Sequence, residues 1–246
     1  MKKTLLKISV IIAICIALIA IAGAFQAGRK LSEKKIDSLQ SQLKNARSEI
    51  KKEKDEAQAA KDAEEKKRNE AEQASADALN LSKDADFLYY SEEYSKALDK
   101  YLEAYKKEYR GDENRIGYMY HYGQGVEQDY IKAVEWYKKS AERGYAVGQF
   151  NLGYMYENGY GVAKNYTEAV KWYRKSAEQG DASGQNNLGV MYEKGQGVDQ
   201  DYSEARKWYR KAAAQGNVNG SFNLHKLAKQ ETETANNNIG SLLPRE

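Results

Sequence analysis

Residues 152–180 read LGYMYENGYGVAKNYTEAVKWYRKSAEQG, and residues 188–216 repeat this stretch as LGVMYEKGQGVDQDYSEARKWYRKAAAQG. A third copy, residues 117–144, carries the same glycines, tyrosines and tryptophan at positions 36 residues earlier. A fixed period of this length is typical of a solenoid, in which each unit buries the apolar side of its neighbour. The spacing therefore predicts stacked units that present a long surface to partners.

Each unit predicts two helices joined by a glycine loop. In the middle unit the first helix covers residues 147–157, where Leu152 and Tyr156 lie four residues apart and share a face. Gly153 lies inside this helix at a cost of about 1 kcal/mol relative to alanine, which indicates that the backbone of a neighbouring helix comes close. The two loop glycines that follow supply the left-handed conformation that ends a helix.

The second helix of each unit begins at a sequence that resembles a capping box. Asn165 precedes Glu168 in one unit and Asp201 precedes Glu204 in the next, so that cap and glutamate side chains can satisfy the first backbone amides. Apolar residues then recur at spacings of three and four, which predicts one buried stripe. That stripe consists of Tyr166, Ala169, Tyr173 and Ala177. Trp172 lies beside it and is expected to cover the joint to the next unit.

These positions resemble the Sel1-like repeat, a relative of the tetratricopeptide repeat, with the motif A-x-x-x-x-L-G-x-x-Y-x-x-G-x-G-V-x-x-D-x-x-x-A-x-x-W-Y-x-x-A-A-x-x-G. The match covers residues 111–216, and Ser140 and Ser176 are mild departures at alanine positions. The resemblance implies an all-α fold, a right-handed α-solenoid of antiparallel helix pairs, and a role as an adaptor that assembles complexes. A cysteine-rich branch of the family is associated with penicillin binding. These repeats contain no cysteine, so we do not expect that activity.

The period also divides the chain into units. The three repeats occupy residues 111–144, 145–180 and 181–216. Residues 84–110 form a degenerate unit, because they keep the register of the second-helix tyrosines and lack the glycine loop. Residues 217–230 predict a final first helix whose polar side chains suit a terminal capping helix. Residues 231–246 are polar and predict a disordered tail.

The N-terminal segment is apolar. Residues 8–25 read ISVIIAICIALIAIAGAF, and a helix of this length covers about 27 Å, close to the hydrocarbon thickness of a bilayer. This stretch predicts a signal-anchor or transmembrane helix within residues 1–30, in a single-pass protein of the bacterial inner membrane with extracytoplasmic repeats. A cleaved secretory signal is the alternative, because residues 22–24 have the small-x-small form of a cleavage site. The flanking charges discriminate little between the two orientations.

Residues 31–83 predict a long helical stalk. They contain no proline or glycine, and carry twelve basic and twelve acidic side chains. Heptad counting places Ile36, Leu39, Leu43 and Ile50 at a and d positions, which favours a partly coiled-coil stalk and a homodimer. Later heptads are alanine-rich and interrupted by charges. A single solvated helix stabilised by i,i+4 pairs is therefore the alternative.

Charge and motif content argue against several classes of function. Residues 84–216 carry nineteen basic and twenty-one acidic side chains, without the basic stripe that nucleic acid requires. His121 is in register with Glu157 and Glu193, but successive repeats stack about 10 Å apart, too far for one metal ion. The Gly-x-Gly-Val loop lacks the preceding strand of a nucleotide site. We expect no catalytic residue, no metal and no cofactor.

The candidate binding surface is the concave face, which the first helices line in tetratricopeptide-like arrays. Its side chains mix aromatic anchors with polar groups, which suits an extended peptide or a helix. They are Asn114, Tyr118, His121, Tyr122, Val147, Phe150, Tyr154, Glu157, Asn158, Ser183, Asn186, Val190, Glu193 and Lys194. The alternative is that these are ordinary surface residues whose aromatic rings pack against neighbouring repeats.

The sequence therefore predicts a membrane-anchored scaffold that binds another protein or a peptide, and not an enzyme. The alternative is a secreted or envelope protein whose N-terminal segment is cleaved. Such a protein acts either as an effector in host interaction or as a cell-wall-binding or hydrolytic protein.

Overall fold

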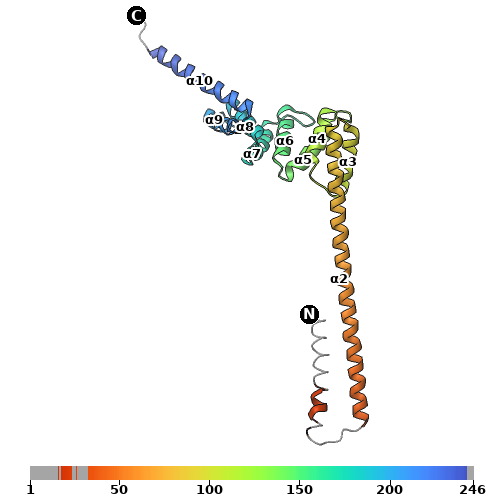
Figure 1. Ribbon diagram of the computed structural model, residues 1–246. Coiled ribbons are helices and arrows are strands. Elements are labelled where there is room, and N and C mark those ends of the chain that lie inside the picture. The colour runs from red at the N-terminus through yellow and green to blue at the C-terminus, as the bar shows by residue number, and fades with distance from the viewer. Residues whose placement is uncertain (1–15, 17, 24–25, 27–32, 243–246) are drawn as a thin grey trace. The chain divides into compact units, whose positions relative to one another are not determined.

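The computed structural model describes residues 16, 18–23, 26 and 33–242 (Figure 1). Every regular element among these residues is a helix. The chain divides into two units, residues 1–73 and residues 74–246. The predicted membrane segment, residues 8–25, lies largely outside the described residues. Within the described part of the chain, no helix combines the length and the apolar character that a membrane span needs.

The first unit contains the beginning of α2 (Glu33–Tyr90), a helix of 58 residues. Its side chains up to residue 77 are mostly exposed, and the half-buried ones include Leu39, Leu43 and Ile50 of the predicted seam. Exposed i,i+4 ion pairs, such as Lys66–Glu70 at 3.8 Å, each add at most about 0.5 kcal/mol. The helix forms as its composition predicts, while pairing of two such helices stays a prediction.

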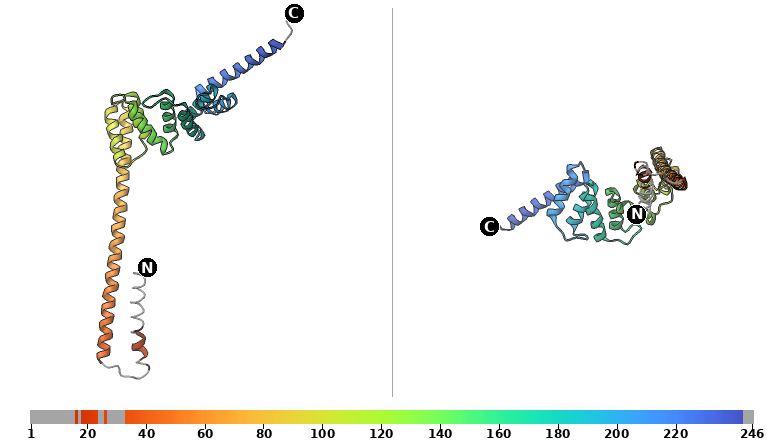
Figure 2. Two further views of the ribbon diagram at one scale, coloured as in Figure 1. Left: turned by 180° about the vertical axis from the view of Figure 1, so that it is seen from behind. Right: turned by 90° about the horizontal axis from the view of Figure 1, so that it is seen from below.

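The second unit is a solenoid of helix pairs, as the 36-residue period predicts. It contains the end of α2, α3 (Tyr94–Lys106), α4 (Glu113–Tyr122), α5 (Tyr130–Glu142), α6 (Ala146–Asn158), α7 (Tyr166–Glu178), α8 (Ala182–Lys194), α9 (Tyr202–Ala214) and α10 (Val218–Leu242). From α4 to α10 each helix packs on the next in the chain, and Figure 2 shows this succession from green to blue. The pairs α4–α5, α6–α7 and α8–α9 are the first, second and third repeats.

The first helices of the repeats form one continuous layer. Helix α4 contacts α6, α6 contacts α8, and α8 contacts α10, in addition to the contacts within each pair. Helices of one layer approach each other most closely on the inner side of a curved array. The contacts therefore support the assignment of α4, α6 and α8 to the concave layer.

The helix ends follow the predicted capping pattern, with one difference. Asn165 Oδ1 accepts a hydrogen bond from the Glu168 amide at 3.0 Å, and Asp201 caps α9 in the same way. The reciprocal half of the capping box is replaced by an ion pair, because the Glu168 carboxylate lies 3.2 Å from Lys171 Nζ, one turn along the helix. Gly159 ends α6 in the left-handed conformation, with φ +74°.

A partly buried polar bridge joins the two helices of each repeat. Gln179 Nε2 donates to Gln149 Oε1 at 2.7 Å, and the third repeat makes the same bridge at 2.8 Å. In the first repeat the equivalent residues are Glu113 and Arg143, whose charged groups lie 3.6 Å apart. Burial raises the pKa of the Glu113 carboxyl, although Arg143 opposes the shift. The first repeat therefore replaces a neutral bridge with a charged one.

The glycine inside each first helix allows close packing, as predicted, but the group that approaches is a tyrosine ring. A Cβ on Gly153 would lie 2.8 Å from the ring of Tyr173 on the second helix, and 3.3 Å from the carbonyl oxygen of Ala169. The other two repeats have the same contact, at 2.7 Å. The missing Cβ thus gives room to a bulky ring more than to a neighbouring backbone.

The tryptophan beside the buried stripe faces the opposite way from the prediction. Trp172 packs with Ala133, Val134 and Tyr137 of α5, which belongs to the preceding repeat, and not with the next repeat. In the first repeat, Trp136 likewise packs on the ring of Tyr105 in the preceding helix α3, with centroids 4.7 Å apart. Each tryptophan directly precedes the buried tyrosine of its helix. At that position the side chain points towards the second helix of the preceding unit, so the tryptophan covers the contact with that unit.

Helix α10 closes the array without a second helix of its own. It keeps the first-helix register, with Leu227 fully buried at the position of Met191. His225 stands where the other first helices have their glycine, 36 residues after Gly189. Val218 and Phe222 are 79% and 67% exposed. The helix extends to Leu242, through residues 231–242 where the sequence predicts disorder, since this stretch has no proline and its only glycine is Gly240.

We expect Gly153→Ala to lower the free energy of unfolding by about 1–3 kcal/mol, because the added methyl group meets a buried ring. Helix propensity alone would give a gain of about 1 kcal/mol. Chemical denaturation measures the difference. The control is Thr167→Ala, at an exposed position of α7, for which we expect a change in the free energy of unfolding within about 0.5 kcal/mol. A more stable Gly153→Ala protein would show that the ring yields easily.

Candidate partner-binding surface

The core of the solenoid contains a column of buried tyrosines whose hydroxyl groups need partners. The column consists of Tyr101, Tyr137, Tyr173 and Tyr209, one in each second helix. Tyr173 Oη donates to Glu157 Oε2 at 2.6 Å, and Tyr209 Oη donates to Glu193 Oε2 at 2.5 Å. Burial raises the pKa of both tyrosines well above the usual range, and the neighbouring carboxylates add to the shift. Two predicted surface residues, Glu157 and Glu193, therefore anchor the core.

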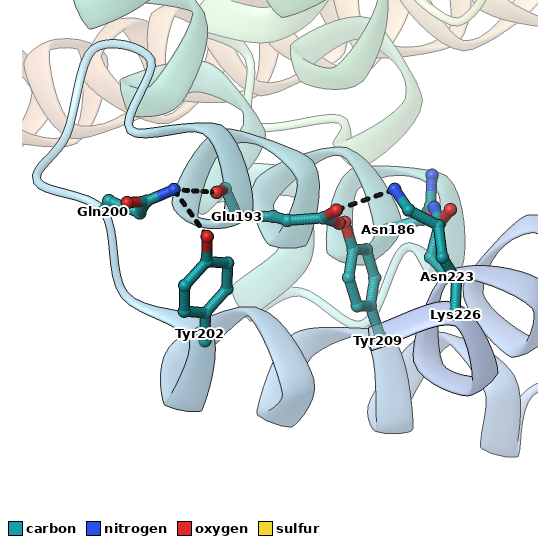
Figure 3. A network of polar contacts seen from close by, with 7 residues as sticks. All are labelled: Asn186, Glu193, Gln200, Tyr202, Tyr209, Asn223 and Lys226. Carbon is teal, nitrogen blue, oxygen red and sulfur yellow. Dashed lines mark hydrogen bonds and ion pairs between the residues drawn. The ribbon is translucent and has the colours of Figure 1, made fainter. Parts of the chain in front are cut away.

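Glu193 is engaged on several sides in the third repeat (Figure 3). Its Oε1 lies 2.8 Å from Lys226 Nζ of α10, while its Oε2 accepts from Tyr209. Its backbone carbonyl accepts from Gln200 Nε2 at 2.7 Å, and the same amide donates to Tyr202 Oη at 3.0 Å. Burial would raise the pKa of Glu193, but the hydrogen bonds from Lys226 and Tyr209 lower it below its usual value. This side chain has little capacity left for a partner.

The amides of the first-helix layer are also paired with each other. Asn223 Nδ2 donates to Asn186 Oδ1 at 2.9 Å, which joins α10 to α8 (Figure 3). Asn151 Nδ2 donates to Asn114 Oδ1 at 2.7 Å, which joins α6 to α4. These bonds link successive repeats, so the predicted Asn114 and Asn186 contribute to stacking.

His121 takes the place of the glutamate in the first repeat. Its Nδ1 lies 3.5 Å from Tyr137 Oη, at the limit of a hydrogen bond, and the side chain is only 7% exposed. Burial lowers the pKa of His121, since no charged partner compensates the desolvation. The imidazole is therefore neutral at pH 7.

Four partly exposed or exposed tyrosines contact the ring of His121, a fifth contacts Tyr122, and we call these five the tyrosine patch. They are Tyr118, Tyr122, Tyr130, Tyr154 and Tyr160. The ring of Tyr122 stacks on the imidazole, with centroids 4.4 Å apart, and lies 4.3 Å from the ring of Tyr118. Tyr130 stacks on Tyr160 at 4.9 Å and thereby joins the first repeat to the second. Tyr118 and Tyr122 are 37% and 54% exposed, so the patch reaches solvent.

The structure brings together four of the predicted residues, Tyr118, His121, Tyr122 and Tyr154. The other predicted residues lie outside this cluster. Phe150 packs against the ring of Tyr173, with centroids 5.9 Å apart. Five further predicted residues do not form a cluster with one another. Val147, Asn158 and Lys194 are exposed, while Ser183 and Val190 are half-buried.

Two members of the patch, Tyr130 and Tyr160, are outside the predicted set. They lie at the start of α5 and in the loop after α6, whereas the prediction drew only on first helices. A signal was present in the sequence, because Tyr160 replaces the glutamine that the other two loops carry at Gln124 and Gln196. An aromatic substitution at one loop position in one repeat marks a local specialisation.

A polar cavity adjoins the patch and shares Tyr118 with it. Its volume is about 360 Å³, and the end of α2, the loop after α3 and the start of α4 line it. Arg115 lies 3.4 Å from Asp86, and burial raises the pKa of the Asp112 carboxyl to about 6 despite a hydrogen bond from Ser82. The prediction missed these charged residues because Asp86 lies in the degenerate unit, while Asp112 and Arg115 of the first repeat are outside the positions chosen for the concave face.

The ladder of His121, Glu157 and Glu193 does not form one site. Each of these side chains faces the buried tyrosine of its own repeat. Across the described part of the chain, no three His, Cys, Asp or Glu side chains are placed to hold a metal ion. The arrangement offers rings, hydroxyl groups and carboxylates for contact.

The fold and this surface define an α-solenoid of helix hairpins whose first-helix layer carries a cluster of aromatic rings. The Sel1 repeat family matches residues 113–145, 146–181 and 182–217, and the chain therefore contains three Sel1 repeats. Repeats of this family generally mediate protein–protein interactions. A comparison with curated proteins finds no match.

Two solved structures are similar to the chain. A Sel1 repeat protein from Oxalobacter formigenes is 40% identical with a TM-score of 0.55, and the match covers 58% of each chain. A protective antigen present in uropathogenic Escherichia coli strains, which displays an SLR fold, is also 40% identical, with a TM-score of 0.56. That match covers 61% of this chain and 34% of the antigen. The chain thus spans less than two thirds of either structure.

Acidification should destabilise the repeats through His121. Its pKa is lowered in the folded state, so below about pH 6.5 the unfolded chain binds a proton that the folded chain resists, and stability falls. We expect His121→Gln to remove this part of the loss between pH 7 and pH 5, as measured by denaturation at each pH.

The matched control is His225→Gln, because His225 is the only other histidine and is exposed on α10. Asp112 titrates in the same range with the opposite sign, since its pKa is raised to about 6, so the informative quantity is the difference between variants. Identical pH profiles for His121→Gln and His225→Gln would contradict the assignment.

Proposed function

We propose that this protein is a scaffold whose partner, a protein or a peptide, binds the concave layer at the tyrosine patch. The observation that carries the proposal is the cluster of partly exposed rings on α4 and α6. Tyrosine is enriched among the residues that dominate binding energy, because it combines a large rigid contact area with a polar hydroxyl group. The first and second repeats offer such anchors.

The third repeat lacks these aromatic anchors, which also favours the first and second repeats as the binding site. At the register of Tyr118 and Tyr154 it has Val190, and the adjacent Glu193 is occupied by Tyr209 and Lys226. Its concave side chains therefore hold the array together. The proposal places the centre of the interface on the first and second repeats and the edge on the third.

The test uses a photoreactive phenylalanine derivative placed at Tyr122 or at Tyr154 of the full chain in cells. We expect each to capture the same protein. We also expect Tyr122→Ala combined with Tyr154→Ala to abolish co-purification of that protein, since hot-spot residues each contribute about 2 kcal/mol or more.

The control position is Tyr202, an exposed tyrosine of the third repeat outside the patch. Equal capture of the protein at Tyr202, or unchanged co-purification by the double variant, would exclude the patch as the interface. Hydrolysis of cell-wall material by the purified chain would instead favour the envelope enzyme.

We also propose that residues 8–25 anchor the chain in a membrane and that α2 spaces the repeats from the anchor. The support is the apolar sequence of that segment and the length of α2, 58 residues or about 87 Å of helix. The seam at Ile36, Leu39, Leu43 and Ile50 would pair two chains as a parallel coiled coil. Secretion after cleavage is the alternative.

Mass spectrometry of the mature N-terminus separates anchor from cleavage. We expect the peptide that spans Ala24 and Phe25 to be recovered intact, with the protein in the membrane fraction. Replacement of Ala22 by a bulky residue is the control, because it blocks cleavage after small-x-small sites. A mature chain that begins at Phe25 in wild type, and not in this variant, would establish secretion.

A further inference from the structure

Several aromatic rings of the repeats, including all three tryptophans, already carry a cation from the same chain. Each tryptophan has a lysine three residues later over its face, at 4.6 Å for Trp136 and Lys139, and at 4.3 Å for Trp172 and Lys175. The third tryptophan, Trp208, repeats the contact at 4.1 Å. Such contacts contribute about 0.5–1 kcal/mol at exposed sites, because the face of a ring is negative.

Several tyrosines outside the patch are covered in the same way. Lys132 lies over Tyr120 at 5.3 Å, and Lys164 lies over Tyr166 at 4.8 Å. The patch differs from them. Among the residues that the structure describes, no lysine or arginine lies over Tyr118, Tyr122, Tyr130, Tyr154 or Tyr160. Within the described part of the chain, this dense set of rings thus has no lysine or arginine of the same chain over any of its faces.

Carboxylates border the patch at both ends, although Oε2 of Glu157 already accepts a hydrogen bond from Tyr173. The cavity beside Tyr118 contains Asp86 and Asp112, and Glu157 follows Tyr154 by three residues, on the same side of α6. Of the nearby cations, Arg115 lines the same cavity and pairs with Asp86, so that the two carboxylates of the cavity outnumber it, and Lys164 covers Tyr166. With His121 neutral at pH 7, the surface presents π faces and acidic groups together.

We propose that the tyrosine patch binds a basic segment of the partner, with an arginine side chain over the ring of Tyr122 and a neighbouring basic residue facing the acidic cavity. The proposal rests on the proposed scaffold function and specifies the chemistry of the segment that docks. Arginine suits the site better than lysine, because its planar guanidinium group stacks on rings and pairs with carboxylates through two hydrogen bonds.

Two other kinds of segment fit less well. An acidic segment would meet Asp112 and Glu157, because Arg115, the cation that lines the cavity, is already paired with Asp86. Like charges disfavour such a complex. A proline-rich segment would use the aromatic surface, as in other aromatic-lined grooves, and would leave the bordering carboxylates unused. Charge complementarity therefore selects the basic segment.

The experiment titrates the full chain with three synthetic peptides by isothermal calorimetry at pH 7.5. The peptides are acetyl-GSRGSRGSRG-amide, the same peptide with glutamine in place of arginine, and nonaproline. We expect binding of the arginine peptide, at least tenfold weaker binding of the glutamine peptide, and weakening with added salt.

Variants then test the site. We expect Tyr122→Leu and Tyr154→Leu each to weaken binding of the arginine peptide about two- to fivefold, because each removes a ring face. Tyr122→Phe keeps the face and should bind within about twofold of wild type. The matched control is Tyr202→Leu, at the register position of Tyr130 in the third repeat, which should not change the affinity. Thermal unfolding of each variant confirms that the fold is intact.

Equal binding of the arginine and glutamine peptides, no binding of the arginine peptide, or preferred binding of nonaproline would overturn the inference. Loss of binding in Tyr202→Leu equal to that in Tyr122→Leu would also overturn it. These outcomes leave the scaffold proposal intact if the photoreactive residues at Tyr122 and Tyr154 still capture a protein. If no protein is captured but the arginine peptide still binds, the scaffold proposal fails, while the preference of the patch for basic groups stands.

Discussion

The structure depends on one contact that recurs every 36 residues, a tyrosine ring set against a glycine. Tyr173 fills the space that a Cβ on Gly153 would need, and its hydroxyl group donates to Glu157 on the same first helix. The ring fixes how closely the two helices approach, and the hydroxyl bond fixes their relative position along the axis. Burial of such a ring contributes several kcal/mol on deletion scales, which exceeds any exposed ion pair in the protein.

The same contact determines which surface groups remain available. Where the acceptor is a glutamate, as in the second and third repeats, the carboxylate is held by the tyrosine and its rotamer is set. In the first repeat the acceptor is His121, whose ring is apolar enough to gather other rings around it. A single difference at one register position therefore has a large effect. A glutamate at this position supports the core, whereas a histidine forms the centre of an aromatic surface. The two later repeats retain the supporting role.

Much of the fold follows from the sequence, because periodic features report local geometry. The period indicates the repeating unit. The capping residues Asn165 and Asp201 and the glycine that ends α6 each meet a backbone requirement that few residue types satisfy. The direction of Trp172 was not predictable in this way, since either neighbouring repeat satisfies the same spacing. Only packing decides between them, and packing depends on the twist of the whole array.

The candidate site was less accessible to sequence reasoning. Tyr118 and Tyr154 follow from the first-helix register, whereas Tyr160 lies in a loop, and Asp86 of the adjoining cavity lies in a unit that lacks the motif. Register arguments also placed Glu193 on the surface, where its backbone lies, without showing that its carboxylate is occupied. Repetition predicts where positions fall, while function resides in the positions that depart from the repeat.

His225 on α10 has a consequence for the evolution of the chain. A glycine at this position is what admits the tyrosine of a following second helix, and a histidine there obstructs it. Duplication of one more 36-residue segment at this end would therefore give a poorly packed junction. The His225 side chain thus makes α10 a poor first helix for a further repeat, without any change in the repeats that precede it.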